Sequence, residues 1–179
     1  MKYLLVIVFL VAFLITAGCV VQNNHPPDIP ALEYRVYELI NQQRNSQGVS
    51  SLAFDPALAS IARSHSQDMA VNNYYSGTDL QGRDPTERGD QLGYPCRKDD
   101  GSVTYGMAEV IFTTRHETTV NGVSRYNYES VEKIAQDAMN GWMSRYGPGK
   151  NFLSSTYDHA GIGVNISSDY TVYITGDFC

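Results

Sequence analysis

The sequence predicts an α+β fold, a three-layer α-β-α sandwich around a central, mainly antiparallel sheet. From Leu39 to Met69, apolar residues recur at helical spacing on both sides of a capped break, which indicates two amphipathic helices. After Gly106 the pattern changes to the short alternation typical of strands, interrupted by one more helical segment near 130–145. Because helices precede and separate the strands, we expect both faces of the sheet to be covered.

The N-terminal segment, residues 1–18, has the features of an export signal: a positive Lys2, an apolar run from Leu4, and small residues before Cys19. Two alternatives follow. Either the segment is a cleaved signal with a lipid on Cys19, or it is an uncleaved anchor, because the apolar stretch approaches the ~20 residues that span a bilayer. Both predict an extracytoplasmic protein held at the cell surface. The three prolines of residues 19–30 predict a stiff linker.

The composition is that of one ordinary globular domain, which we place at residues 31–179. The chain has 179 residues, of which 18% are charged and 42% are hydrophobic, and its formal net charge is -6. Only 13 residues are Lys or Arg, and they form no basic run. Because phosphate binding needs clustered positive charge, the composition argues against a nucleic-acid partner.

Three helix starts can be justified in chain order. The first helix is predicted at about 31–47, with its apolar residues on one face. The second begins at Pro56, because Asp55 is a good N-cap acceptor and proline fits the first helical position. A short third helix follows the same pattern, with Asp84 as the cap and Pro85 as the first residue.

The strands follow the third helix. Residues 107–112 predict a strand that is largely apolar on both faces, so Glu109 must point into the interior. Asn121 and Gly122 lie between β-branched flanks and predict a hairpin turn. The remaining elements are a helix at about 130–145 and two strands at 160–166 and 170–177.

Seven short motifs occur in one order along the chain: Asn41-Gln-Gln-Arg44, Asp55-Pro-Ala-Leu58, His65 with Asp68-Met69, Tyr75-Ser76, Gly82-Arg83 with Pro85, Gly141-Trp-Met143, and His159-Ala-Gly-Ile-Gly-Val164. In this order and spacing the chain resembles the CAP superfamily, also called SCP, which contains cysteine-rich secretory, antigen-five and pathogenesis-related proteins. The resemblance is to its prokaryotic secreted branch and covers Leu39 to Val164. It implies the same α-β-α sandwich.

The resemblance also implies a cleft in which two histidines and two glutamates can hold a divalent metal such as Zn²⁺. Gly77 stands where the first histidine is expected, and Glu109 matches the first glutamate. Arg145 replaces the second glutamate, and residues 147–151 contain no histidine. One carboxylate near a cation is a poor metal site, so we expect no metal ligands and no cofactor.

The candidate binding cleft therefore consists of Gly77, Glu109, Arg145 and His159. On family geometry, Arg145 is expected to form a buried ion pair with Glu109. Glu109 and His159 are also weak catalytic candidates, as an acid-base pair. His65 lies on the apolar stripe of the second helix, where a hydrogen-bonded core histidine is expected.

The cysteines are consistent with export. If Cys19 carries the lipid or belongs to the anchor, Cys96 and Cys179 remain as a pair and are expected to form a disulfide. The alternative is two free thiols.

Three functions remain open at this stage. The first is a non-enzymatic, envelope-tethered module that binds a small ligand, lipid, peptide or envelope component. The second is a hydrolase acting on peptide or envelope polymer with Glu109 and His159. The third is a surface or adhesion module without a functional cleft. In each case the membrane is contacted through the N-terminus.

Overall fold

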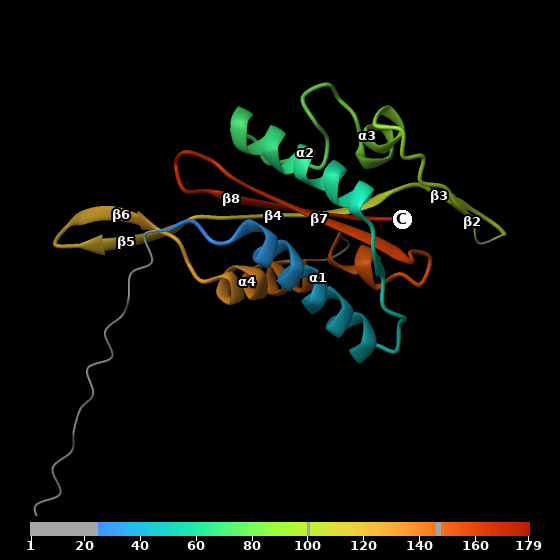
Figure 1. Ribbon diagram of the computed structural model, residues 1–179, viewed down its shortest axis with the longest axis horizontal. Helices are drawn as coiled ribbons and strands as arrows, with labels where there is room; N and C mark the ends of the chain where they lie inside the picture. Colours follow the sequence, from blue (N-terminus) through green and yellow to red (C-terminus); the bar gives the residue numbers. More distant parts are fainter. Residues whose placement is uncertain (1–24, 100, 146–147) are drawn as a thin grey trace, which may run out of the picture.

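The computed structural model describes residues 25–99, 101–145 and 148–179 (Figure 1). The expected signal or anchor segment 1–18 and residues 19–24 of the linker, with Cys19, lie outside these ranges. Among the described residues, no helix has both the length and the apolar character needed to cross a membrane.

The fold is a four-stranded sheet with helices on both faces, as the sequence predicts. The strands, in sheet order, are β1 (Ala53–Phe54), β7 (His159–Ile166), β8 (Val172–Phe178) and β4 (Ala108–Thr114). The helices are α1 (Ile29–Ser46), α2 (Pro56–Asn72), α3 (Pro85–Gln91) and α4 (Val131–Ser144). Figure 1 shows α1 and α4 on one face of the sheet and α2 with α3 on the other.

The sheet is mixed because one short strand runs parallel to its neighbour. β1 pairs in parallel with β7, placing Ala53 opposite His159, whereas β7 with β8 and β8 with β4 are antiparallel. The sequence does not predict β1, since two residues are too few to show strand alternation.

Helix α1 begins at Ile29, two residues before the predicted start. The Asp28 side chain caps it by accepting a hydrogen bond from the Ala31 N–H, and Pro30 lies in the first turn. Proline is tolerated there because the N–H groups of the first turn have no partner within the helix. The linker therefore ends earlier than the predicted residue 30.

The predicted caps of α2 and α3 are confirmed. Asp55 accepts hydrogen bonds from the N–H groups of Ala57 and Leu58. Asp84 and Glu87 form a reciprocal capping box at the start of α3. These caps fix the two helices that cover one face of β4.

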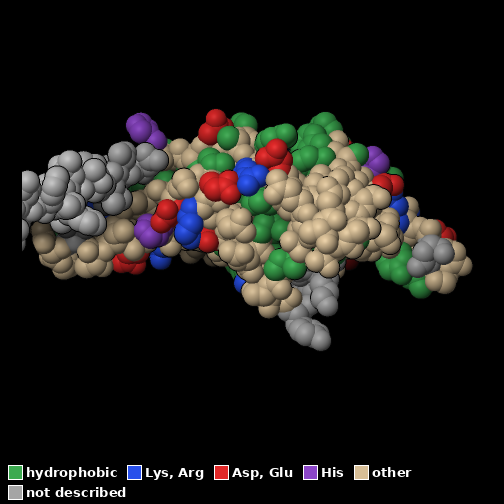
Figure 2. Space-filling model, turned by 90° about the horizontal axis from the view of Figure 1, so that it is seen from below, with side chains coloured by type: hydrophobic (Ala, Val, Ile, Leu, Met, Phe, Trp, Pro, Cys, Tyr) green, Lys and Arg blue, Asp and Glu red, His purple; other side chains and the backbone are tan. Residues whose placement is uncertain are grey.

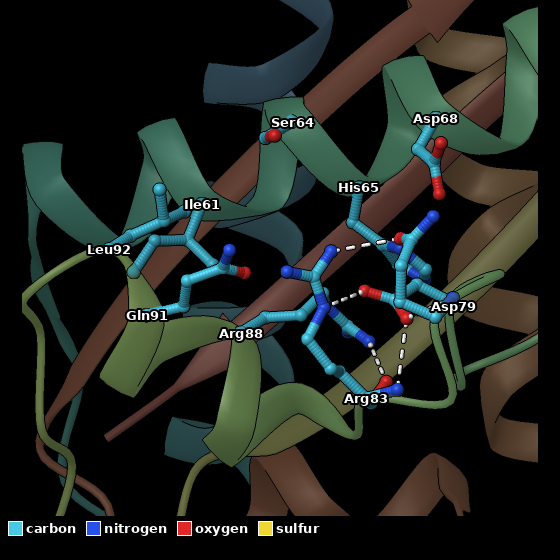
Figure 3. Close-up of a pocket in the computed structure, with 10 residues that line it drawn as sticks. Ile61, Ser64, His65, Asp68, Asp79, Arg83, Arg88, Gln91 and Leu92 are labelled. Carbon is cyan, nitrogen blue, oxygen red and sulfur yellow. Dashed lines mark hydrogen bonds and ion pairs between the residues drawn. The ribbon is translucent and has the colours of Figure 1, made fainter.

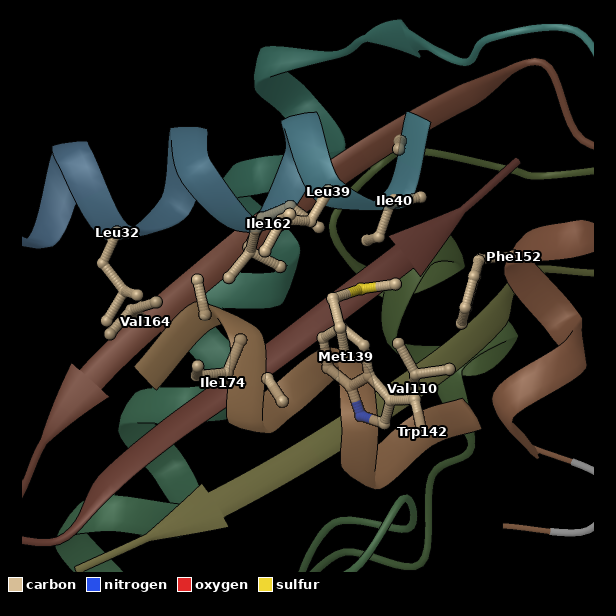
Figure 4. Packing of buried hydrophobic residues seen from close by; sticks show 14 of the residues in the cluster. Leu32, Leu39, Ile40, Val110, Met139, Trp142, Phe152, Ile162, Val164 and Ile174 are labelled. Atoms are coloured by element: carbon tan, nitrogen blue, oxygen red, sulfur yellow. The ribbon is translucent and has the colours of Figure 1, made fainter. Parts of the chain in front are cut away.

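The main core lies between the sheet and the α1–α4 pair (Figure 4). Its fully buried side chains include Leu32, Ile40, Ile134, Trp142, Phe152, Ile162 and Ile174. The other face of the sheet packs against α2 through a smaller cluster of Leu58, Ile61 and Met107 with the two cysteines. Figure 2 views the molecule from the α1–α4 side, where Arg35 of α1 bonds to Glu132 of α4.

Helix α2 lies almost directly on β7. A Cβ atom at Gly163 would lie 2.0 Å from the backbone nitrogen of Arg63, and one at Gly161 would lie 2.0 Å from that of Ala59. Real side chains do not approach that closely, so these two glycines permit the contact. The position of α2 above the sheet follows from them.

Smaller elements surround the sandwich. The predicted hairpin consists of β5 (His116–Val120) and β6 (Val123–Asn127), with Asn121 and Gly122 at positive φ. A second two-stranded sheet pairs β2 (Lys98–Asp99) with β3 (Thr104–Tyr105), and η1 (Pro148–Leu153) is a 3₁₀ helix.

Cys96 and Cys179 are placed as a disulfide pair. Their Cα atoms lie 5.7 Å apart, within the range that a disulfide requires. The bond connects the segment after α3 to the residue that follows β8.

Candidate functional site

Glu109 lies in a buried polar cluster between β4 and the helices α2 and α3. It projects from the face of β4 that α2 covers, and only 5% of its side chain is exposed. The Arg88 Nη2 atom of α3 donates a hydrogen bond to Glu109 Oε2 in an ion pair. A buried carboxylate requires such a partner, because the loss of water strongly disfavours an isolated charge.

His65 is buried on α2, as the sequence predicts, and belongs to the same cluster. Its Nε2 atom lies 3.0 Å from the carbonyl oxygen of Ser76 and 3.8 Å from Glu109 Oε2. Burial, and then the nearby positive charge of Arg88, lower the pKa of His65 to about 4. At neutral pH the ring is therefore uncharged, and Nε2–H donates to the Ser76 carbonyl.

Arg88 also holds the loop that follows α2. Its Nη1 atom donates to the carbonyl oxygens of Gly77, at 2.8 Å, and Arg83, at 3.1 Å. Its Nε atom is buried and has no hydrogen-bond partner among the described residues. One guanidinium thus connects α3, the preceding loop and Glu109.

Gly77 packs directly against the carboxylate. A Cβ atom on Gly77 would lie 3.2 Å from Glu109 Oε1, which is tighter than an ordinary van der Waals contact. A larger residue at this position would have to displace the loop or the Glu109 side chain. Gly77 thus lets the loop close over Glu109 while Arg88 balances the charge.

Asp177 of β8 lies beside Glu109. The two residues are paired in the β4–β8 register, and Asp177 is completely buried. Burial raises the pKa of Glu109 to about 7, although Arg88 opposes the rise. Burial, and then the charge of Glu109, raise the pKa of Asp177 well above its usual range.

The exposed edge of β4 is covered by side chains from three segments. The carbonyl oxygen of Ile111 accepts hydrogen bonds from Trp142 Nε1 at 2.8 Å and from the Tyr75 hydroxyl at 2.9 Å. Asn151 Nδ2 donates to the carbonyl of Glu109 at 3.3 Å. These hydrogen bonds pair carbonyl groups that this edge strand would otherwise leave without a partner.

The expected ion pair between Arg145 and Glu109 is not formed. Arg145 follows α4 and is exposed; its Nη1 atom lies 3.3 Å from the Tyr75 hydroxyl, and its guanidinium lies 5.9 Å from the Tyr75 ring centre. Arg88 approaches Glu109 from α3 instead. The physical reason is burial, since Arg88 reaches the carboxylate inside the fold and Arg145 stays at the surface.

His159 and Glu109 are not brought together either. Both project from the α2 face of the sheet, but β8 lies between their strands, which places the backbones roughly 10 Å apart or more. His159 is part-exposed, and its Nδ1 atom bonds to Asp158. Of the four cleft residues, only Gly77 and Glu109 are in direct contact.

Sequence reasoning missed Arg88 and Asp177. Arg88 lies in a short polar helix, where an arginine is usually solvated. Asp177 is an acid within an otherwise apolar strand, which is the signal that could have singled it out.

A cavity of about 210 Å³ opens beside this cluster, between α2 and α3 (Figure 3). His65 and Arg88 line its inner end, and Arg83, Gln91 and Ser64 line its outer part. The cavity and the buried cluster therefore share two side chains.

Comparisons with known proteins agree with this fold. The sequence profile of CAP, the cysteine-rich secretory protein family, matches residues 37–178. Two curated proteins of Bacillus subtilis are similar: YkwD, 29% identical over 79% of this chain and 45% of its own length, and the membrane protein YlbC, 27% identical over 74% of this chain and 31% of its own. The chain thus spans less than half the length of these relatives.

Two solved structures share the fold. One is an extracellular protein with an SCP domain from Bacillus anthracis, with a TM-score of 0.59 and 21% identity, covering 84% of this chain and 40% of the other. The second is an outer surface protein of Borrelia burgdorferi, with a TM-score of 0.62 and 14% identity over 82% of this chain and 90% of the other. Since the family profile spans most of the sequence, from the middle of α1 to the end of β8, the chain belongs to the CAP family.

Proposed function

We propose that this protein is an extracytoplasmic, envelope-tethered CAP-domain protein that acts as a non-enzymatic binding module and has no working metal site. The ion pair between Arg88 and Glu109 carries the proposal. The guanidinium already neutralises the carboxylate that a metal ion would need as a ligand.

The donor set around Glu109 fits a divalent cation poorly. Gly77 offers no imidazole, and Arg145 adds a positive charge near the outer edge of β4. Among the described residues, no group of three His, Cys, Asp or Glu side chains is placed to hold a metal ion. Zinc prefers three or four nitrogen, sulfur or oxygen ligands. Here Glu109 is bonded to Arg88, and the neighbouring His65 is engaged through Nε2 by the Ser76 carbonyl, so the cluster offers a poor ligand set.

The proposed location is supported by the N-terminal sequence and by the relatives. The two structural neighbours are described as an extracellular protein and an outer surface protein, and YlbC is described as a membrane protein. The Cys96–Cys179 pair fits a non-cytosolic environment. Either a lipid on Cys19 or an uncleaved helix would supply the tether.

A hydrolase that uses Glu109 and His159 has less support. An acid-base pair must reach one substrate atom together, and these two side chains are separated by a strand.

Zinc calorimetry on residues 25–179 tests the proposal. We expect no binding at micromolar zinc. The variant His116→Asn is the control for surface binding, because His116 Nδ1 lies 3.0 Å from Glu129 in an exposed pair. Micromolar binding that survives in His116→Asn and is lost in Glu109→Gln would contradict the proposal.

The tether is tested separately by the mass of the mature protein. A lipid on Cys19 predicts a mature mass above that of the polypeptide beginning at residue 19, and the loss of this lipid mass in Cys19→Ser. A mass that includes residues 1–18 and no lipid would instead support the uncleaved anchor.

A further inference from the structure

The cavity between α2 and α3 is large enough for one small ligand unit only. Its volume of about 210 Å³ lies below the ~300 to 1,000 Å³ of pockets that hold whole drug-sized ligands. Figure 3 shows the Arg83 guanidinium reaching across the cavity from the loop before α3, with Gln91 on one side and α2 behind it. A single sugar ring or one amino-acid residue would fill this space.

The charged groups in the cavity wall are already partnered. Asp79 accepts hydrogen bonds from the Arg83 N–H, the Gln81 N–H and Arg83 Nε. Arg88 is paired with Glu109. Asp68 accepts from the Tyr74 hydroxyl and from Asn72, but among the described residues it has no cation partner. An anionic ligand would meet this uncompensated carboxylate, so the cavity favours a neutral one.

Several hydrogen-bonding groups facing the cavity remain free. Within the described part of the chain, Arg83 Nη1, the Ser64 hydroxyl and the Gln91 side-chain amide have no hydrogen-bond partner, whereas Arg83 Nη2 donates to Gln81 Oε1 at 2.9 Å. The buried Nε of Arg88 is also unpartnered. Arginine contributes donors only, while serine and glutamine donate and accept. A suitable ligand therefore carries a carbonyl oxygen together with hydroxyl groups.

One end of the cavity is apolar. Ile61 of α2 and Leu92, which follows α3, lie next to each other at this end, with Gln91 beside them (Figure 3). Leu92 is 58% exposed, so a ligand methyl group would cover apolar surface that water contacts in the free protein. A methyl group beside a carbonyl acceptor and an N–H donor is the pattern of an acetamido group.

We propose that this cavity binds an N-acetylated amino sugar, with its carbonyl oxygen at Arg83, its methyl group beside Ile61 and Leu92, and its ring hydroxyls at Ser64 and Gln91. This inference rests on the proposed binding function and specifies its ligand. A peptide carries the same amide but lacks the ring hydroxyls, so it leaves Ser64 and Gln91 unbonded.

The experiment titrates residues 25–179 with N-acetylglucosamine and its β-1,4-linked dimer, monitored by amide chemical shifts. Glucose lacks the acetamido group, and N-acetyl-alanine methylamide lacks the sugar ring. We expect saturation by the acetylated sugars at millimolar concentration and at least tenfold weaker binding of glucose and of the peptide amide. Shifts should be concentrated in α2 and in residues 79–92.

Two variants and a control locate the site. Ser64→Ala and Gln91→Ala should each weaken binding by about tenfold, the effect of roughly one lost hydrogen bond. Both residues are exposed, so the fold should be unaffected. Gln67→Ala, also exposed on α2 but outside the cavity lining, should bind like the unchanged protein.

Three outcomes would overturn the inference: no saturable binding of either acetylated sugar up to about 20 mM, equal losses in all three variants, or preference for the peptide amide. None of them affects the zinc calorimetry, so failure of this inference is distinguishable from failure of the proposed function. Conversely, zinc binding at Glu109 would leave a positive sugar titration standing.

Discussion

Asp177 lies directly opposite Glu109 in the antiparallel register of β4 and β8, so two acidic side chains are buried next to each other on the α2 face of the sheet. Only one guanidinium, that of Arg88, is bonded to this pair among the described residues. Two ionised carboxylates and one cation would leave an uncompensated buried charge, so the pair keeps one proton at neutral pH.

This pair predicts a contribution to stability that is lost as the pH rises through about 7. The pKa of Glu109 is raised from 4.5 to about 7, so above pH 4.5 the folded state binds more protons than the unfolded state. Its contribution to stability is complete below pH 4.5 and is lost as the pH rises through the folded-state value. Urea unfolding between about pH 5 and pH 8 measures the trend as a difference from a variant that keeps His65, because the lowered pKa of His65 makes its own contribution to stability rise with pH in the lower part of this range.

The control is Asp177→Asn. An asparagine has the size of the acid and does not titrate. We expect this variant to lose less stability between the two pH values than the unchanged protein. An equal change of the free energy of unfolding with pH in the variant and in the unchanged protein would contradict the shared proton.

A second prediction separates the two arginines. Arg88→Met leaves Glu109 buried and uncompensated, so we expect a loss of about 3 to 5 kcal/mol in the free energy of unfolding. Arg145→Met removes only an exposed contact with Tyr75 and should cost less than about 1 kcal/mol. Urea denaturation of both variants provides the comparison.

Adding Glu109→Gln to Arg88→Met should recover part of the loss, because the buried charge is then gone. Equal losses for the two arginine variants would contradict Arg88 as the partner of Glu109, and a larger loss for Arg145→Met would support Arg145 instead.

The third prediction concerns the cysteine pair. Cys96 and Cys179 are 83 residues apart, and in the chain-entropy description a loop of this length contributes about 4.5 kcal/mol when the pair is oxidised. Thermal unfolding with and without a reducing agent measures the effect. The double variant Cys96→Ser with Cys179→Ser should have the thermal stability of the reduced protein. If a reductant lowered the stability of this variant as much as that of the unchanged protein, the effect would not come from the Cys96–Cys179 bond.

The fourth prediction tests the contact between α2 and β7. Gly163→Ala would place a methyl group 2.0 Å from the backbone of α2, so we expect a loss of more than about 3 kcal/mol, or no folding. Gly176→Ala on β8 is the matched control: its nearest atom would lie 3.2 Å away on a side chain that can shift. Similar losses in the two variants, measured by urea denaturation, would show that α2 is not held against β7.

Local signals were sufficient for most of the fold. Caps and apolar periodicity predicted the helices, because Asp55 and Asp84 act on backbone groups only two or three residues away. The Asn121–Gly122 turn could be predicted for the same reason. Strand β1 could not be predicted, since its pairing with β7 depends on residues more than a hundred positions away.

The buried cluster could be predicted only in part. The alternating pattern of β4 pointed Glu109 into the interior, but its partner depends on how α3 packs over β4. Arg88 and Arg145 are equivalent as residue types, and only the three-dimensional fold distinguishes them. The β4–β8 register is needed to see that Asp177 lies opposite Glu109.

The cysteine pair divides the chain into two mechanical parts. When it is oxidised, residues 96–179 form a closed covalent ring that holds β4, β7 and β8, whereas α1, β1 and α2 precede the ring. A pulling force applied at residue 25 therefore loads α1 and the two-residue pairing of β1 first. The three long strands would keep their connection under such a load, so tension on the tether would detach α1, β1 and α2 before it separated β7, β8 and β4.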